Sequence, residues 1–328
     1  MKGPAQLDLF GGERPVDPGE EPIPLPDPAL VELAARVPSH VHLGTSSWTF
    51  PGWKGLVYRR RYPSERALVD RSLEEYARHP LLRTVGIDRS YYAPVPEAEL
   101  ARWSAQLPDG YRCVMKVWDG ITAMVFPEHA RMGSRAGQPN PSFLDPERFE
   151  LEVAAQVRAA FAGHLAAFVL EIPPSPVAPD PRAFAERLEH FLSRAPQPFH
   201  YAVELRDRRL LTPRYLRVLR EHGATHVFNL WSRMPPIGAQ LDIEGALMGP
   251  VCVARLMLPV GTKYEARREA FAPFDRIVEV QPQMRADVVR LARMTEELGV
   301  PLFVIVNNKV EGCSPLTILA LCELLAAR

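Results

Sequence analysis

AAFVLEIPPSPVAPDPRAFAERLEHFLSRAPQPFHYAVELR, residues 166–206, contains the repeating unit that decides the fold. Its two ends, 166–172 and 200–206, are short apolar runs rich in β-branched and aromatic residues, which predicts buried strands. Between them, 181–194 starts with proline and carries apolar side chains at helical spacing. Apolar strands that alternate with helices predict a parallel sheet with both faces covered.

The same unit recurs along the chain from about residue 40. The eight predicted strands are 41–46, 83–88, 111–118, 166–172, 200–206, 225–230, 251–257 and 302–307. The predicted helices are 65–79, 97–107, 147–164, 181–194, 213–222, 283–298 and 315–327. Only a poor helix is predicted between strands six and seven, in 232–250.

Eight strand–helix units predict an α/β fold that closes into a (β/α)8 TIM-type barrel. The structural alternative is an open, doubly wound sheet. That fold usually carries a glycine-rich fingerprint after its first strand. Here the first strand leads instead into Gly44-Thr45-Ser46-Ser47-Trp48.

The composition bounds the class of protein. Of 328 residues, 47% are hydrophobic and 24% charged, as in a soluble globular protein. Lys plus Arg and Asp plus Glu both total 39, so net charge gives no support for nucleic-acid binding, although a local basic patch remains compatible with it. The four cysteines form no CxxC pair and are expected to be reduced. No signal pattern and no 18-residue apolar run are present, which predicts a cytoplasmic protein.

The chain divides into an arm and one domain. Residues 1–28 are rich in proline, glycine and acidic residues, which predicts a disordered N-terminal arm. Residues 38–328 are predicted to form the single barrel. The long segment at about 120–148 is interpreted as an insertion over the barrel mouth.

Polar side chains follow every predicted strand, and chemistry in such barrels occurs at the carboxyl ends of the strands. Glu204 and Arg206 are two residues apart and therefore share a face, as do Lys116 and Trp118. An inward network of alternating charge would bind an anion through its cations and exchange protons through a carboxylate. The candidate catalytic residues are Glu204, Glu171 and Lys116. The candidate substrate-binding residues are Trp48, Trp53, Asp88, Tyr92, Trp118, Arg206, Trp231, Arg255, Asn307 and Asn308.

Each of these interpretations has a structural alternative. The charges are also compatible with a set of ion pairs that only stabilises the fold. The tryptophans would either stack on a sugar or a base, or pack the loops over the barrel mouth. No metal and no cofactor is predicted, because most histidines lie near strand starts or on helices and no phosphate-binding or zinc motif occurs.

Several motifs resemble those of the YecE-like family, known as domain of unknown function 72. The resemblance covers about residues 40–327. It rests on Gly44-Thr45-Ser46-Ser47-Trp48, Pro51-Gly52-Trp53-Lys54-Gly55, Leu73-Glu74-Glu75-Tyr76-Ala77, the stretch from Thr84 to Tyr92, Lys116, Pro173-Pro174-Ser175, Val203-Glu204-Leu205-Arg206, Arg255, and Asn307-Asn308 followed by Gly312. It implies a TIM-type barrel and no particular activity.

The chain departs from the family pattern at several sites. The resemblance leads us to expect Glu in place of Gly86 and His near Ala123. It also leads us to expect Asn, Gln and His in place of Asp88, Glu171 and Lys309. If the missing Glu and His serve catalysis in relatives, this chain is a divergent or inactive member.

The arm contains one apolar island, Gln6-Leu7-Asp8-Leu9-Phe10. It resembles the short peptide by which bacterial proteins bind the replication sliding clamp. Leu9 and Phe10 would enter an apolar groove while the Gln6 amide fixes the register, so Gln6, Leu7, Leu9 and Phe10 are candidate partner-binding residues. The alternatives are a chance match and an island that folds back onto the barrel.

Three functions follow from these observations. The first is an enzyme, recruited to DNA by the clamp, that acts on a nucleotide or phosphodiester at the barrel mouth, as in DNA repair. The second is a non-catalytic binding module. The third is a metabolic barrel enzyme that acts on a small phosphorylated or sugar-like substrate.

Overall fold

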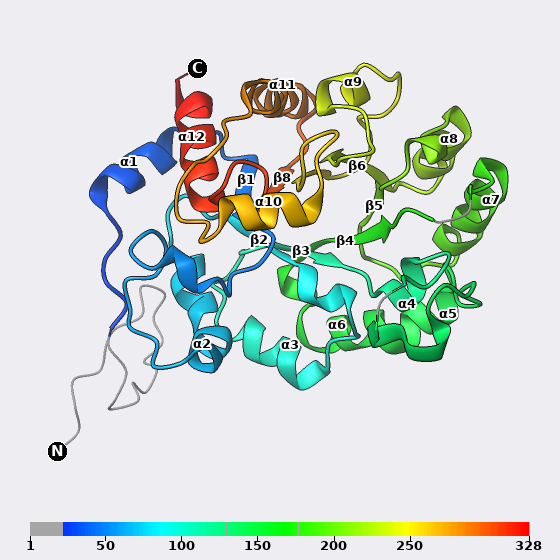
Figure 1. The fold of residues 1–328 in the computed structure, drawn as a ribbon, viewed down its shortest axis with the longest axis horizontal. Coiled ribbons are helices and arrows are strands. Elements are labelled where there is room, and N and C mark those ends of the chain that lie inside the picture. Colours follow the sequence, from blue (N-terminus) through cyan, green and yellow to red (C-terminus); the bar gives the residue numbers. More distant parts are fainter. Residues whose placement is uncertain (1–21, 129, 176–177, 328) are drawn as a thin grey trace.

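A computed structural model describes residues 22–128, 130–175 and 178–327 of the chain. Eight strands form a closed barrel in the order β1 to β8, and every neighbouring pair is parallel, including the β8–β1 pair that closes the ring (Figure 1). The strands are β1 (Val41–Thr45), β2 (Thr84–Ile87), β3 (Cys113–Lys116), β4 (Leu165–Ile172), β5 (Tyr201–Leu205), β6 (Thr225–Leu230), β7 (Cys252–Leu256) and β8 (Leu302–Val306). The predicted barrel is therefore confirmed.

Helices surround this ring (Figure 1). They are α1 (Pro28–Arg36), α2 (Glu65–Ala77), α3 (Glu97–Ser104), α4 (Asp119–Thr122), α5 (Pro146–Phe149), α6 (Ala155–Ala160), α7 (Pro181–Leu192), α8 (Pro213–Glu221), α9 (Ile237–Leu241), α10 (Tyr264–Phe271), α11 (Pro282–Leu298) and α12 (Ser314–Ala326). Short 3-10 segments occur at Pro51–Trp53, Asp88–Tyr91, Ala130–Arg135, Ala162–His164 and Arg208–Leu210, and a π-helical turn, Glu150–Ala154, joins α5 to α6.

Local sequence explains where the helices begin. Asp180 and Thr212 accept hydrogen bonds from the first turns of α7 and α8, and each is followed by proline. Ser64 does the same for α2 by accepting from the amide of Ala67. Helix α11 ends at Gly299, whose φ of 67° is in the left-handed region that glycine adopts without strain.

Three helices were not predicted from the sequence, namely α1, the four-residue α4 and α10. Helix α1 starts at Pro28, inside the range assigned to the arm, and its N-cap is Asp27. Its buried residues, Leu33 and Ala34, join the core next to α12. Helix α10 follows β7, where the polar sequence Tyr264–Phe271 gives little amphipathic signal. The weak 232–250 segment contains only the short α9.

Strand and helix ends also differ from the prediction. Strand three runs over Cys113–Lys116 rather than 111–118, so Trp118 belongs to the turn that precedes α4. The predicted helix 147–164 is α-helical only in α5 and α6. A π-helical turn separates these two helices, and α6 stops at Ala160. Element ends are decided by hydrogen bonds that propensity does not resolve.

The core has two layers. The larger cluster lies between the strands and the surrounding helices and includes Phe149, Phe168 and Tyr215. The smaller one includes Val114, Val169, Val227 and Ile305, from four different strands. Inward-pointing side chains of this kind fill a barrel as a packed core rather than a pore. The functional side chains therefore have to lie at the ends of the strands.

Two further features concern the whole chain. Cys113, Cys252, Cys313 and Cys322 are free and buried, as the sequence predicted. Among the described helices, none has both the length and the apolar character needed to cross a membrane.

Candidate functional site

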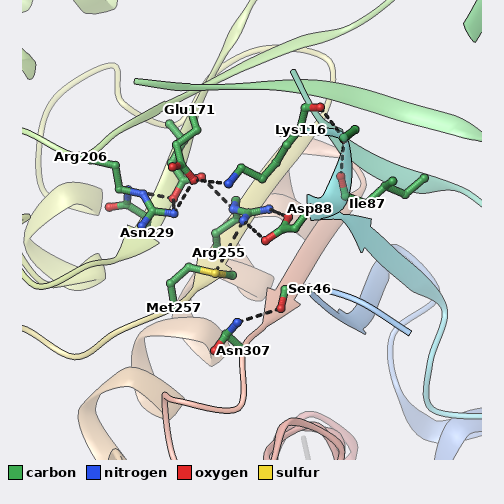
Figure 2. Close-up of polar contacts among 12 residues, drawn as sticks. Ser46, Ile87, Asp88, Lys116, Glu171, Arg206, Asn229, Arg255, Met257 and Asn307 are labelled. Atoms are coloured by element: carbon green, nitrogen blue, oxygen red, sulfur yellow. Dashed lines mark hydrogen bonds and ion pairs between the residues drawn. The ribbon is translucent and has the colours of Figure 1, made fainter. Parts of the chain in front are cut away.

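Six ionised side chains form a continuous ladder at the carboxyl ends of five strands (Figure 2). Starting from β3, positive and negative groups alternate in the order Lys116, Glu171, Arg206, Glu204, Arg255 and Asp88. Three of these groups are cations and three are anions, so the charges of the ladder sum to zero. The predicted network of alternating charge is therefore present in the structure.

Arg255 on β7 joins Glu204 to Asp88, the last member of the ladder. Its side chain and that of Glu204 are both 0% exposed, and 2.8 Å separates Arg255 Nε from Glu204 Oε2. The guanidinium Nη1 and Nη2 donate to the two carboxylate oxygens of Asp88 at 2.9 and 2.8 Å. Such a planar, two-point ion pair fixes both partners in orientation.

Glu171 joins the first member of the ladder, Lys116, to Arg206. Its Oε2 lies 2.7 Å from Lys116 Nζ and 2.7 Å from Arg206 Nη2. Burial alone would raise the pKa of Glu171, but Arg206, Lys116 and Arg255 outweigh it and lower that pKa to about 2. Glu171 is therefore ionised at neutral pH and holds two cations in place.

Strand register brings these residues to one level. Glu171 on β4 is directly paired with Glu204 on β5, and Asn229 on β6 is paired with Arg255 on β7. Asn229 Nδ2 donates to the carbonyl of Leu205 at 2.7 Å and lies 3.4 Å from Glu204 Oε1. The fold thus places two carboxylates side by side, and the arginines of β5 and β7 compensate their charge.

A cleft of about 780 Å³ opens above the strand ends. Its wall on the β3 side is Val125 to Glu128, from the segment predicted to be an insertion. Pro173 and Pro174 follow β4, and Trp231 follows β6. The other lining residues are Ser175, Ser232, Arg233, Leu258, Gly261, Thr262, Lys263 and Tyr264. A largely apolar cleft of this size with a few polar groups is typical of sites for small molecules.

Trp231 connects the cleft to the ladder. The Arg206 guanidinium carbon lies 3.8 Å from the centroid of its ring, a close cation–π contact. At the other wall, Lys309 Nζ lies 4.2 Å from the ring centroid of Tyr264, the first residue of α10. Arg233 and Lys263 line the same cleft and make no salt bridge within the described residues.

The remaining predicted residues lie outside the ladder and the cleft lining. Trp48 and Trp53 are 1% and 2% exposed, and Trp48 contacts Trp103 of α3 edge to face. Trp118 is stacked by Arg148, whose guanidinium carbon is 4.7 Å from the ring. Tyr92 is 62% exposed.

The two asparagines after β8 make local contacts. Asn307 Nδ2 donates to Ser46 Oγ at 2.9 Å, a bond that joins the ends of β8 and β1 (Figure 2). Asn308 Oδ1 accepts from the amide and the hydroxyl of Ser314, at 2.8 and 2.7 Å. Asn308 therefore holds the first turn of α12.

Sequence reasoning did not select Asn229, which contacts Glu204, or four further residues that the structure places at the site. Tyr91 lies under Lys116, with 3.9 Å between Nζ and the ring centroid. Arg233, Lys263 and Tyr264 line the cleft. The tyrosine follows a predicted strand end and could have been found there, whereas the other three lie in or beside surface turns and give no distinguishing pattern.

The position of the expected family glutamate is closed in this chain. A Cβ atom on Gly86 would lie 2.8 Å from Ile305 Cγ2 and 3.2 Å from Ser46 Cα. A glutamate side chain has no room there without rearrangement of the barrel interior. Ala123, where a histidine is expected, is fully buried. Across the described residues, no group of three His, Cys, Asp or Glu side chains is arranged to hold a metal ion.

The fold and this site define a closed parallel (β/α)8 barrel with a ligand-sized cleft and a charged ladder at its mouth. Residues 42–328 match the family described as "Protein of unknown function DUF72", and the chain belongs to this family. The resemblance seen in the sequence is therefore confirmed.

Solved structures agree with the fold. A DUF72 protein from Enterococcus faecalis is 17% identical, with a TM-score of 0.59 over 88% of this chain and 96% of that one. A DUF72 protein from Thermotoga maritima is 18% identical, with a TM-score of 0.57 over 88% of this chain and 99% of that one. No curated protein matches the chain.

Proposed function

We propose that this protein binds a nucleotide in the cleft at the barrel mouth and acts on it there. The observation that carries the proposal is the combination of aromatic rings and cations without salt bridges in one ligand-sized cleft. Tyr264 supplies a ring face for stacking, Trp231 lines the same cleft, and Arg233 and Lys263 supply positive charge. Base stacking on aromatic rings and phosphate binding by cations are the two interactions that nucleotide sites combine.

The ladder supplies the chemistry in this proposal. With a pKa near 2, Glu171 is a poor base as long as Lys116 and Arg206 hold its charge. A phosphate that takes Lys116 away from Glu171 removes one of these cations and raises the pKa of the carboxylate. The substrate would thereby activate its own general base, which is the role we assign to Glu171, with Lys116 joining Arg233 and Lys263 as a phosphate ligand.

The arm supplies the location in this proposal. Gln6, Leu7, Leu9 and Phe10 lie outside the described residues, and the proposal for them rests on sequence alone. Binding of Gln6-Leu7-Asp8-Leu9-Phe10 to the bacterial sliding clamp would bring the barrel to replicating or repaired DNA, where nucleotides and phosphodiesters are its substrates.

Isothermal titration with the four deoxynucleoside 5′-monophosphates tests the binding step. We expect the double variant Arg233→Ala/Lys263→Ala to lose binding by about tenfold or more and to show a weaker salt dependence. The matched control is Arg217→Ala, which removes an exposed arginine from α8. Failure of the unaltered protein to bind any of the four nucleotides would refute the proposal.

Clamp recruitment is tested with a purified bacterial sliding clamp. We expect the full chain to bind it and the variant Leu9→Ala/Phe10→Ala to lose binding while nucleotide affinity stays unchanged. Equal retention of the two proteins on immobilised clamp would refute the recruitment step and leave the cleft proposal standing.

A non-catalytic binding module is the second candidate. The observation that favours it is that the ladder is neutral and internally paired, which also fits a purely structural set of ion pairs. The two candidates differ in one measurement. Mass spectrometry of each nucleotide, or of a short DNA strand, after incubation with the protein detects a product only if the site is catalytic.

A further inference from the structure

Three buried polar atoms at the ends of β5 and β6 have no hydrogen-bond partner within the described residues. They are Asn229 Oδ1, Arg206 Nε and Trp231 Nε1. Asn229 is 0% exposed and Arg206 is 4% exposed. Buried polar atoms in native proteins are nearly always paired, because leaving one unpaired costs the free energy of its desolvation. Two of these atoms belong to side chains that are almost fully buried, and the third belongs to Trp231, which lines the cleft.

Glu204 and Arg206 connect these side chains. Asn229 Nδ2 and Arg206 Nη2 approach the same oxygen, Glu204 Oε1, at 3.4 and 2.7 Å. The Arg206 guanidinium lies against the Trp231 ring, which lines the cleft. Asn229 lies one residue before the end of β6 and Trp231 is the first residue after that strand. Trp231 packs against the inner cluster, which contains Val227 of β6.

The identity of the free atom on Asn229 is fixed by its neighbour. The Nδ2 amide donates to the Leu205 carbonyl at 2.7 Å. Exchanging the nitrogen and oxygen of this amide would place two acceptors against each other. Asn229 Oδ1 is therefore an acceptor, and it lies in the same cluster as the two unpaired donors.

We infer that this cluster, Arg206, Asn229 and Trp231, forms a subsite for the polar edge of a nucleobase. The Arg206 and Trp231 N–H groups would donate to a base carbonyl or ring nitrogen, and Asn229 Oδ1 would accept from a neighbouring base N–H. Adjacent acceptors and donors are what base edges present. The inference rests on the proposed function. It adds that the base is the part of the nucleotide that binds beneath the cleft.

The other buried tryptophans with an unpaired indole nitrogen do not lie beside the cleft. Trp48 Nε1 and Trp53 Nε1 are also buried and without a hydrogen-bond partner in the described part of the chain. Neither tryptophan lines the cleft, and both lie in the layer between strands and helices. Trp53 therefore serves as the matched control for Trp231.

The test compares Trp231→Phe with Trp53→Phe by isothermal titration. Trp231→Phe keeps an aromatic ring beside Arg206 and removes the indole N–H. We expect its affinity for the tightest-binding deoxynucleoside 5′-monophosphate to fall about fivefold, which corresponds to one hydrogen bond. Affinity for 2-deoxyribose 5-phosphate, which has no base, is expected to stay unchanged, as is every affinity of Trp53→Phe. Arg206→Lys removes the second donor and is expected to give a loss of the same size.

Each remaining outcome decides the question. Nucleotide affinity unchanged in Trp231→Phe, or an equal loss for nucleotide and deoxyribose phosphate, overturns the subsite while the cleft proposal stands. If the unaltered protein binds neither the nucleotides nor deoxyribose phosphate, the proposed function and the subsite fall together. Circular dichroism of each variant shows that the comparison is made between folded proteins.

Discussion

Replacing Arg255 by methionine removes the cation that joins Glu204 to Asp88 and leaves an unbranched apolar side chain in its place. Arg255 is 0% exposed and pairs with Glu204, which is also 0% exposed, and with Asp88, whose side chain is 24% exposed. After the substitution Glu204 keeps only Arg206 as an ionic partner. Asp88 loses both hydrogen bonds from the guanidinium but remains in contact with solvent.

The two carboxylates set the size of the effect. Breaking a buried ion pair from one side costs about 3–5 kcal/mol, because the remaining charge stays buried. Glu204 retains one arginine and Asp88 is partly solvated, so we expect the lower end, about 3 kcal/mol. Glu204→Gln in the Arg255→Met background removes the uncompensated charge, and we expect the double variant to be more stable than the sum of the single changes predicts.

Urea unfolding followed by circular dichroism measures these free energies. The matched control is Arg290→Met, which breaks the exposed pair with Asp242, where the two side chains are 46% and 66% exposed. Exposed pairs contribute about 0–1 kcal/mol, so the control should be close to neutral. Two results would show that the ladder does not act as a buried ionic network. One is that Arg255→Met is no more destabilising than Arg290→Met. The other is that the double variant loses as much free energy of unfolding as the two single changes added together.

Two further predictions concern the barrel itself. Gly86→Ala places a Cβ 2.8 Å from Ile305 Cγ2, and we expect overpacking to lower the free energy of unfolding in urea by about 1–3 kcal/mol. Gly163→Ala, with nothing within 4 Å of the added Cβ, should have little effect in the same assay. An equal effect of both changes would contradict the crowding inferred at Gly86. Burial lowers the pKa of His226 to about 4, against about 6.5 in the unfolded chain, so its neutral form contributes stability above pH 6.5 that is lost as the pH falls from 6.5 to 4. Urea midpoints measured across this range should fall less steeply for His226→Gln, and an unchanged slope would contradict the assignment.

The sequence by itself determined the barrel. Eight apolar runs separated by helical segments leave few arrangements that cover both faces of a parallel sheet, and closure into a ring is the one that chains of eight units adopt. It also determined which charged side chains form the ladder, because strand ends converge and residues two apart on one strand share a face. Glu171, Glu204, Arg206 and Arg255 were all selected on that ground.

Tertiary structure decided which of these residues form ion pairs with one another. Residue spacing does not give the register between strands, and it is register that pairs Glu171 with Glu204 and thereby requires arginines beside them. The tryptophans illustrate the same limit, since an indole after a strand end turns either inward or outward. Trp48 packs on Trp103 of α3, whereas Trp231 lines the cleft and contacts Arg206. The cleft itself is made by turns from several units, and short polar turns carry no sequence pattern that says which of them face the same space.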